Sequence, residues 1–247
     1  MIRHIVLTFL GCLLNFSLAS TLHAQSVTSA VPLPLPLPLP LNPPSKAINN
    51  PVKVEALMQA AKNNDASGMI AALLTDVDVG IRDANFPHNT ALHWAAWENA
   101  DKSLALLLQQ KNIAVDTLNG VDETPLMIAA LKGNLTVMRQ LLKAEAYPNK
   151  TGWTPLHYAA TNGHIEAMQL LLDAYSYIDA ESPNKTTPLM MAAYSKKIEA
   201  VRFLLNAGAD SRPVNASGWD AARFAESVQA AEIASVLREH AQGLQAK

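Results

Sequence analysis

A seven-residue pattern recurs along this chain at a spacing of about 33 residues, and this repeat constrains the fold more than any other feature of the sequence. Four copies read Thr-(Ala or Pro)-Leu-(His or Met)-x-Ala-Ala, with a leucine in the third position. A fixed period of this length indicates a stack of similar supersecondary units in place of one globular core. The column of leucines extends to one further copy at each end, where the last copy has alanine: Leu57, Leu92, Leu126, Leu156, Leu189 and Ala222.

Each copy carries the signals of a helix that begins after its threonine. A threonine hydroxyl can cap a helix by accepting a hydrogen bond from a free amide. The proline that follows in three copies, as at Pro155, already has a helical φ and needs no amide partner there. A second apolar block, such as Leu170-Leu-Leu172, follows at a fixed offset and predicts a second helix that packs into the next repeat.

These patterns together resemble the ankyrin repeat. Gly163-His-Ile-Glu166 and Asn206-Ala-Gly-Ala-Asp210 are similar to that family's turn between helices and its turn at the end of the second helix. The resemblance covers residues 52 to about 240 and implies an all-α repeat solenoid of helix-turn-helix units and β-hairpin fingers. We expect four central repeats between two capping repeats, because the terminal copies carry polar residues. The shortest step, from Leu126 to Leu156, predicts one shortened finger.

Residues 1–24 have the layout of a secretory signal peptide: a basic start, an interrupted apolar stretch and small residues up to Ala24. We expect cleavage after Ala24, or alternatively after Ala19, and a periplasmic mature protein. A transmembrane helix is an alternative, but the stretch is short for a bilayer about 30 Å thick. A lipoprotein acylated at Cys12 is another, although its mature chain would begin with apolar residues. Cys12 is the only cysteine, so the cleaved protein cannot depend on disulfides.

Residues 25–51 are interpreted as a proline-rich spacer that precedes an ankyrin-repeat domain at 52–247. Between residues 31 and 44 nearly every second residue is proline, which lacks an amide donor and fixes φ near −65°. This composition predicts an extended polyproline II segment. A docking site for a proline-binding groove is the alternative interpretation.

The sequence offers no convincing catalytic or metal site. His93 and His157 occupy the histidine column, which in the ankyrin family bridges neighbouring hairpin backbones, and Met127 and Met190 replace them in the other central repeats. There is no His-Glu-x-x-His run and no phosphate-binding glycine-rich loop. We therefore expect neither enzyme activity nor a metal or cofactor. A net charge of −2 gives no argument for a nucleic-acid partner.

The resemblance implies that the fingers and the exposed flank of the first helices form a concave binding face. Specificity on such a face must come from positions that the repeat itself does not dictate. Tryptophan and tyrosine supply large contact areas at low entropic cost, which makes Trp97 the expected anchor. The candidate protein-binding residues on this face are Phe86, Trp97, Glu98, Glu123, Lys132, Trp153, Asn162, Tyr194 and Trp219.

The sequence thus predicts a monomeric protein-interaction module of the periplasm or cell envelope. Its expected ligand is a partner protein, with no nucleic-acid binding and no membrane insertion after signal cleavage. An inhibitor or immunity protein that sequesters an exported hydrolase or toxin is the alternative. An enzyme or ligand binder within the repeat fold is a third possibility, which would require a deep pocket with perturbed titratable groups.

Overall fold

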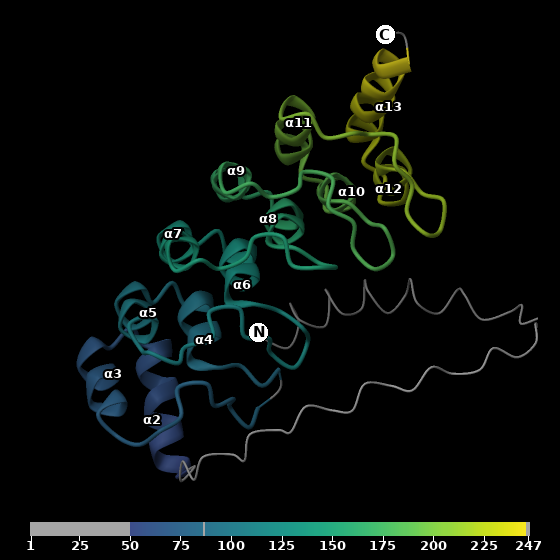
Figure 1. Cartoon of the computed structure of the whole chain (residues 1–247). Helices are drawn as coiled ribbons and strands as arrows, with labels where there is room; N and C mark the ends of the chain where they lie inside the picture. Colours follow the sequence, from purple (N-terminus) through teal and green to yellow (C-terminus); the bar gives the residue numbers. More distant parts are fainter. Residues whose placement is uncertain (1–49, 86, 246–247) are drawn as a thin grey trace, which may run out of the picture. The chain divides into compact units, whose positions relative to one another are not determined.

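The structure of the protein, a computed structural model, describes residues 50–85 and 87–245 (Figure 1). The predicted signal peptide and nearly all of the predicted spacer lie outside these residues. Within them, twelve α-helices form six consecutive pairs, and none of these helices combines the length and the apolar character needed to cross a membrane. The pairs are α2 (Pro51–Lys62) with α3 (Ala66–Leu73), α4 (Ala91–Trp97) with α5 (Asp101–Leu108), α6 (Pro125–Lys132) with α7 (Leu135–Lys143), α8 (Pro155–Asn162) with α9 (Ile165–Asp173), α10 (Pro188–Tyr194) with α11 (Ile198–Asn206), and α12 (Ala221–Ser227) with α13 (Ala231–Gln245).

The helices form two rows. The first helices of the pairs contact one another in chain order, from α2 to α4 and on through α6, α8 and α10 to α12. The second helices do the same from α3 to α13. We term these the inner row and the outer row. Six helix pairs match the four central and two capping repeats that the sequence predicts.

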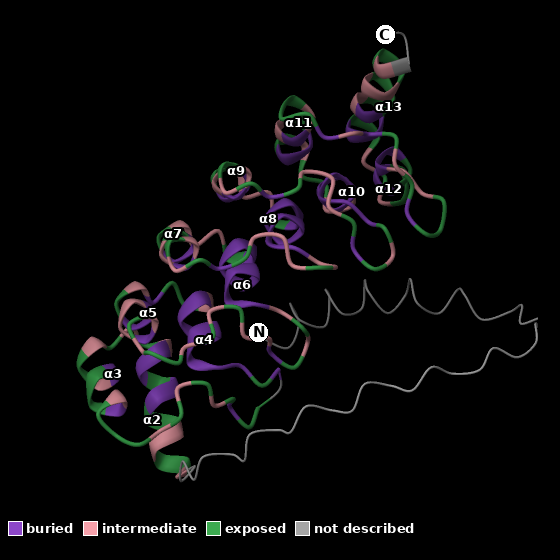
Figure 2. Cartoon of the chain, in the orientation of Figure 1, coloured by how far each residue is buried: buried purple, intermediate pink, exposed green. Residues whose placement is uncertain are grey.

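The inner row carries most of the core. All five leucines of the repeated column, including Leu156, are completely buried, and Ala222 is nearly so. The alanine pairs behind the four central leucines, such as Ala159-Ala160, are also completely buried. An alanine adds only a methyl group, so consecutive inner helices can approach closely. Figure 2 shows the resulting band of buried residues along α4, α6, α8 and α10.

Threonine caps fix where the inner helices begin. The Thr124 hydroxyl accepts from the backbone N–H of Met127 at 3.2 Å, and Thr187 does the same for Met190 at 3.4 Å. Each hydroxyl thereby satisfies one of the free amides of the first helical turn. The following prolines, Pro125 and Pro188, lie at the first helical position and lack the amide that would otherwise need a partner.

The fingers connect each outer helix to the next inner helix. In residues 50–85 and 87–245 no β-strand is assigned, so the fingers are tight turns and not the paired strands of a β-hairpin. The connection between α7 and α8, residues 144–154, is three residues shorter than the connection 174–187 between α9 and α10, as the repeat spacing predicts. Four fingers are closed by a backbone hydrogen bond: Asp83 N to Asn89 O at 2.8 Å, Asn119 N to Glu123 O at 3.0 Å, Ser182 N to Thr186 O at 3.0 Å, and Asn215 N to Trp219 O at 2.9 Å.

Candidate protein-interaction surface

The candidate binding residues lie at the two ends of the inner helices. Phe86 falls outside the described residues. Glu123, Trp153 and Trp219 directly precede the residues that cap the next inner helix. The remaining candidates lie at the C-terminal ends of inner helices: Trp97, Glu98, Lys132, Asn162 and Tyr194. We term these two ends of the inner helices, with the residues that directly precede their caps, the inner face.

Trp97 and Lys132 lie in consecutive repeats, and their side chains are in contact. The Lys132 ammonium lies 4.6 Å from the centroid of the Trp97 ring, at a distance that gives a cation–π interaction. Trp97 is partly buried, whereas Lys132 and the neighbouring Glu98 are exposed. The Asn134 amide donates to the backbone carbonyl of Ala96 at 2.7 Å and holds this helix end in place. An aromatic ring, a cation and a carboxylate are therefore displayed together on a rigid support.

Glu123 is engaged within the protein. Its carboxylate accepts from the Asn119 amide at 2.9 Å and from the Tyr158 hydroxyl at 3.0 Å. The Asn119 amide also donates to Asn89 at 3.0 Å. Burial raises the pKa of Glu123, although both of its hydrogen bonds act in the opposite direction. This side chain thus joins residues of successive fingers and inner helices.

Asn162 also makes a contact between repeats. Its amide donates to the backbone carbonyl of Leu131 at 2.7 Å, and Nε2 of His164 lies 3.0 Å from the same oxygen. The Asn162 residue remains exposed overall. Its amide hydrogen bond ties the end of α8 to the end of α6.

The C-terminal candidates belong to an aromatic cluster built around Phe224 of α12. The Phe224 ring lies 6.0 Å from the Tyr194 ring and 5.6 Å from the Trp219 ring, each in an edge-to-face arrangement. The Arg223 guanidinium lies 5.0 Å from the Trp219 centroid. Tyr194 and Trp219 are partly buried and Phe224 is fully buried, so the two outer rings pack on one side and face solvent on the other.

Trp153 has a comparable setting in the shortened finger. Its ring lies 5.1 Å from the ring of His157, edge to face, and the residue is partly buried. This contact links the finger to the first turn of α8. Trp153 therefore has a packing role as well as an exposed surface.

The two column histidines bridge neighbouring fingers, which confirms the role that the family resemblance implied. Nδ1 of His93 accepts from the Thr90 N–H at 3.2 Å, so its hydrogen lies on Nε2, which donates to the Glu123 carbonyl at 3.0 Å. Burial lowers the pKa of His93 to about 4. In the methionine copies a sulfur replaces Nδ1: Met127 Sδ lies 3.4 Å from the Thr124 N–H donor nitrogen.

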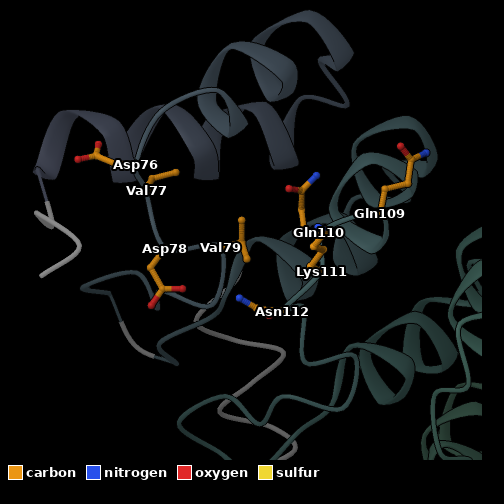
Figure 3. A pocket seen from close by; sticks show the side chains of 8 residues that line it. All are labelled: Asp76, Val77, Asp78, Val79, Gln109, Gln110, Lys111 and Asn112. Atoms are coloured by element: carbon orange, nitrogen blue, oxygen red, sulfur yellow. The ribbon is translucent and has the colours of Figure 1, made fainter. Parts of the chain in front are cut away.

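Residues 50–85 and 87–245 contain no group of three or more His, Cys, Asp or Glu side chains placed to hold a metal ion. Two open hollows lie between consecutive connections of the repeat stack. One of about 630 Å³ lies between residues 76–79 and residues 109–112, which face each other in Figure 3. The other, of about 380 Å³, is lined by residues that include Asp116, Tyr147 and Lys150. None of the predicted binding residues lines either hollow.

Sequence reasoning missed two sets of aromatic residues. Trp94 is buried on α4, where its indole N–H donates to Asp83 at 2.7 Å and the Lys62 ammonium lies 4.2 Å from its ring. Three tyrosines in the turns after α7 and α9 are highly exposed: Tyr147 at 53%, Tyr175 at 87% and Tyr177 at 66%. The sequence carried one signal for these tyrosines: each is an aromatic residue at a turn position outside the repeated motif.

Comparison with known families identifies the repeat. A model of three consecutive ankyrin repeats matches residues 107–183, and a model of a single ankyrin repeat matches residues 88–119 and 184–218. The chain belongs to the ankyrin-repeat family. Ankyrin repeats are protein–protein interaction modules and are typically not enzymes.

One curated relative is a probable E3 ubiquitin-protein ligase, XBOS31, of Oryza sativa subsp. japonica. It is 31% identical over 168 residues, which are 68% of this chain and 31% of the ligase. The chain therefore spans about a third of the length of this relative.

Proposed function

We propose that this chain is a protein-interaction module of the periplasm or cell envelope that binds one partner protein on its inner face, with Trp97 near the centre of the contact. The observation that carries this proposal is the Trp97–Lys132 pair at the exposed end of α4. The corresponding position in the next three inner helices holds Leu131, Thr161 and Tyr194. Because the stack accepts such different side chains there, packing does not require a tryptophan.

The surroundings of Trp97 suit a contact anchor. Binding hot spots are enriched in tryptophan and lie in places that become fully desolvated on binding. The helix end that carries Trp97 is held by Asn134, so little entropy is lost when a partner docks. The Lys132 ammonium is exposed and can exchange its contact with the ring for a carboxylate of the partner, while Glu98 offers the opposite charge beside it.

The location in the envelope is supported by the signal-peptide layout of residues 1–24.

The similarity to the rice ligase covers 31% of that protein and lies in shared repeats, so we propose no ubiquitin transfer for this chain. A partner that is an exported hydrolase or toxin would make this module an inhibitor. An activity assay on the purified pair would then decide between inhibition and simple association.

The test is a differential capture from periplasmic extract. Wild-type protein, Trp97→Ala and a matched control, Leu74→Ala, are cross-linked to bound proteins in parallel and the captured proteins are compared by mass spectrometry. Leu74 is an exposed apolar residue on the turn after α3, away from the inner face. We expect a partner that is captured by the wild type and by Leu74→Ala but not by Trp97→Ala. Identical captured sets for all three proteins would contradict the proposal.

A further inference from the structure

The three exposed tyrosines occupy the turns that follow two consecutive outer helices. Tyr147 follows α7, and Tyr175 and Tyr177 follow α9. We term these three residues the tyrosine row. Exposed aromatic side chains gathered in one region of a surface mark interaction sites more often than scattered ones do. The row lies at the start of two fingers, directly after the outer helices, and includes none of the residues at the ends of the inner helices that form the inner face.

The backbone of Tyr175 is in an unfavourable conformation. Its φ is 62°, in the left-handed region, where a bulky side chain is disfavoured. The same turn position holds Glu145 in the preceding repeat, with φ 64°, and Gly208 in the following repeat, with φ 99°. Glycine adopts this region freely, and Tyr175 gains little from packing because it is 87% exposed. The fold thus sets a left-handed turn here but does not require a tyrosine, and the exposed ring of Tyr175 is available for a contact outside the chain.

Hydrogen bonds from the preceding repeat fix the backbone of the row. The Asp116 carboxylate accepts from the Tyr147 N–H at 3.1 Å, and the side-chain Oδ1 of Asn149 accepts from the Tyr177 N–H at 2.8 Å. The Asn149 amide also donates to the Tyr175 carbonyl at 2.9 Å. Tyr147 and Tyr177 thus occupy equivalent positions in consecutive repeats. Packed helices lie about 8–10 Å apart, which sets the spacing of these two positions.

The surroundings of the row are acidic. Residues 143–151 and 173–181 carry four acidic side chains and two lysines, and Lys150 is already paired with Asp122 at 3.1 Å. Next to Tyr147 lies the hollow of about 380 Å³, which is also lined by Asp116. Carboxylates beside aromatic faces favour a cation, since the guanidinium group of arginine both stacks on rings and pairs with carboxylates.

We propose that the tyrosine row is a second docking surface, and that its ligand is an extended, proline-containing segment of a partner protein with an arginine at every third residue. A polyproline II helix has three residues per turn and rises about 3.1 Å per residue, so one face repeats about every 9 Å. This distance matches the spacing of consecutive repeats. Successive arginines of the ligand therefore meet Tyr147 and Tyr177 in turn, and aromatic-lined grooves are the usual receptors for such segments.

The test uses the full chain and a fluorescein-labelled peptide of five Arg-Pro-Pro units, with fluorescence anisotropy as the readout. We expect saturable binding that weakens with added salt, and at least tenfold weaker binding for a peptide of five Glu-Pro-Pro units. The double variant Tyr147→Ser/Tyr177→Ser should bind the basic peptide at least tenfold more weakly than the wild type. The controls Trp97→Ala and Leu74→Ala should bind it as the wild type does.

Tyr175→Gly separates a binding role from a structural one. Because glycine fits the left-handed backbone, this variant should melt no lower than the wild type while binding the basic peptide more weakly. The proposal is overturned if the basic peptide does not bind, if the acidic peptide binds equally well, or if the double variant binds unchanged. Loss of binding in Trp97→Ala alone would also overturn it, because the peptide would then occupy the inner face.

Discussion

Nε2 of His157 lies 2.9 Å from the carbonyl oxygen of Thr186, the residue that precedes the cap of the next inner helix. Nδ1 of the same ring accepts from the Thr154 N–H at 3.2 Å, so the neutral ring carries its hydrogen on Nε2 and donates it to that carbonyl. One buried imidazole thereby joins two fingers and holds the inner face in register. The His93 ring makes the equivalent bridge two repeats earlier, to the carbonyl oxygen of Glu123.

These two histidines predict how stability depends on pH. Burial lowers the pKa of His93 and of His157 to about 4, from an ordinary value near 6.5. Between these values the unfolded chain binds protons that the folded chain does not, so the free energy of unfolding falls as the pH falls from 6.5 to 4. The loss is about 3 kcal/mol per histidine at full extent. Urea titrations at a series of pH values measure it.

The methionine copies provide the control for this prediction. His93→Met/His157→Met places in both sites the residue found at Met127 and Met190. The free energy of unfolding of this variant should change less between pH 6.5 and pH 4 than that of the wild type, whatever its value at neutral pH. The carboxyl group of Glu123, whose pKa is raised by burial, acts in the opposite direction as it protonates. An unchanged slope in the double variant would show that the histidines do not govern this dependence.

Leu156→Ala should lower the free energy of unfolding by about 2–5 kcal/mol. Leu156 is completely buried on α8, which packs between α6 and α10, so little relaxation can fill the cavity. Chemical denaturation measures the loss. Leu74→Ala is the matched control, because Leu74 is 83% exposed and its truncation should change stability by no more than about 0.5 kcal/mol. A loss below about 1 kcal/mol for Leu156→Ala would contradict the repeat register.

A fragment of residues 50–247 should fold on its own, because each repeat packs against its neighbours in the stack. Asn50 belongs in the fragment, since its side chain accepts from the Val52 N–H at 3.0 Å and caps α2. Circular dichroism should show a helical spectrum and a cooperative thermal transition. An unfolded fragment beside a folded full chain would mean that the preceding residues are part of the fold.

Export predicts a processed N-terminus. If residues 1–24 are a signal peptide, N-terminal sequencing of the protein purified from the periplasm should begin at Gln25, or at Ser20 if cleavage follows Ala19. The uncleaved chain in the membrane fraction would contradict this prediction. A mature chain that begins at an acylated Cys12 would favour the lipoprotein alternative.

The sequence predicted the parts of the molecule that the repeat dictates. The leucine column follows from a signal that recurs in register, and the bridging role of His93 is implied by the resemblance to the ankyrin family; burial confirms the first and a hydrogen bond the second. The surface was less predictable, because its contacts join variable positions of different repeats. In the sequence Glu123 looks like an exposed finger residue. In the structure it is partly buried, and its carboxylate accepts hydrogen bonds from Asn119 and Tyr158. The residue type of Tyr175 does not indicate a left-handed backbone, and only the repeat register, which aligns it with Gly208, carries that signal.

The central claim is that a partner protein binds the inner face through Trp97. Once the differential capture has identified that partner, isothermal titration calorimetry of the wild type and of Trp97→Ala tests the claim most directly. Truncation of a hot-spot tryptophan costs about 2 kcal/mol or more, which corresponds to about thirtyfold in affinity. We predict a loss of that size in Trp97→Ala with a nearly unchanged melting temperature. Unchanged affinity would contradict the claim. If the melting temperature also fell sharply, Trp97 would belong to the core.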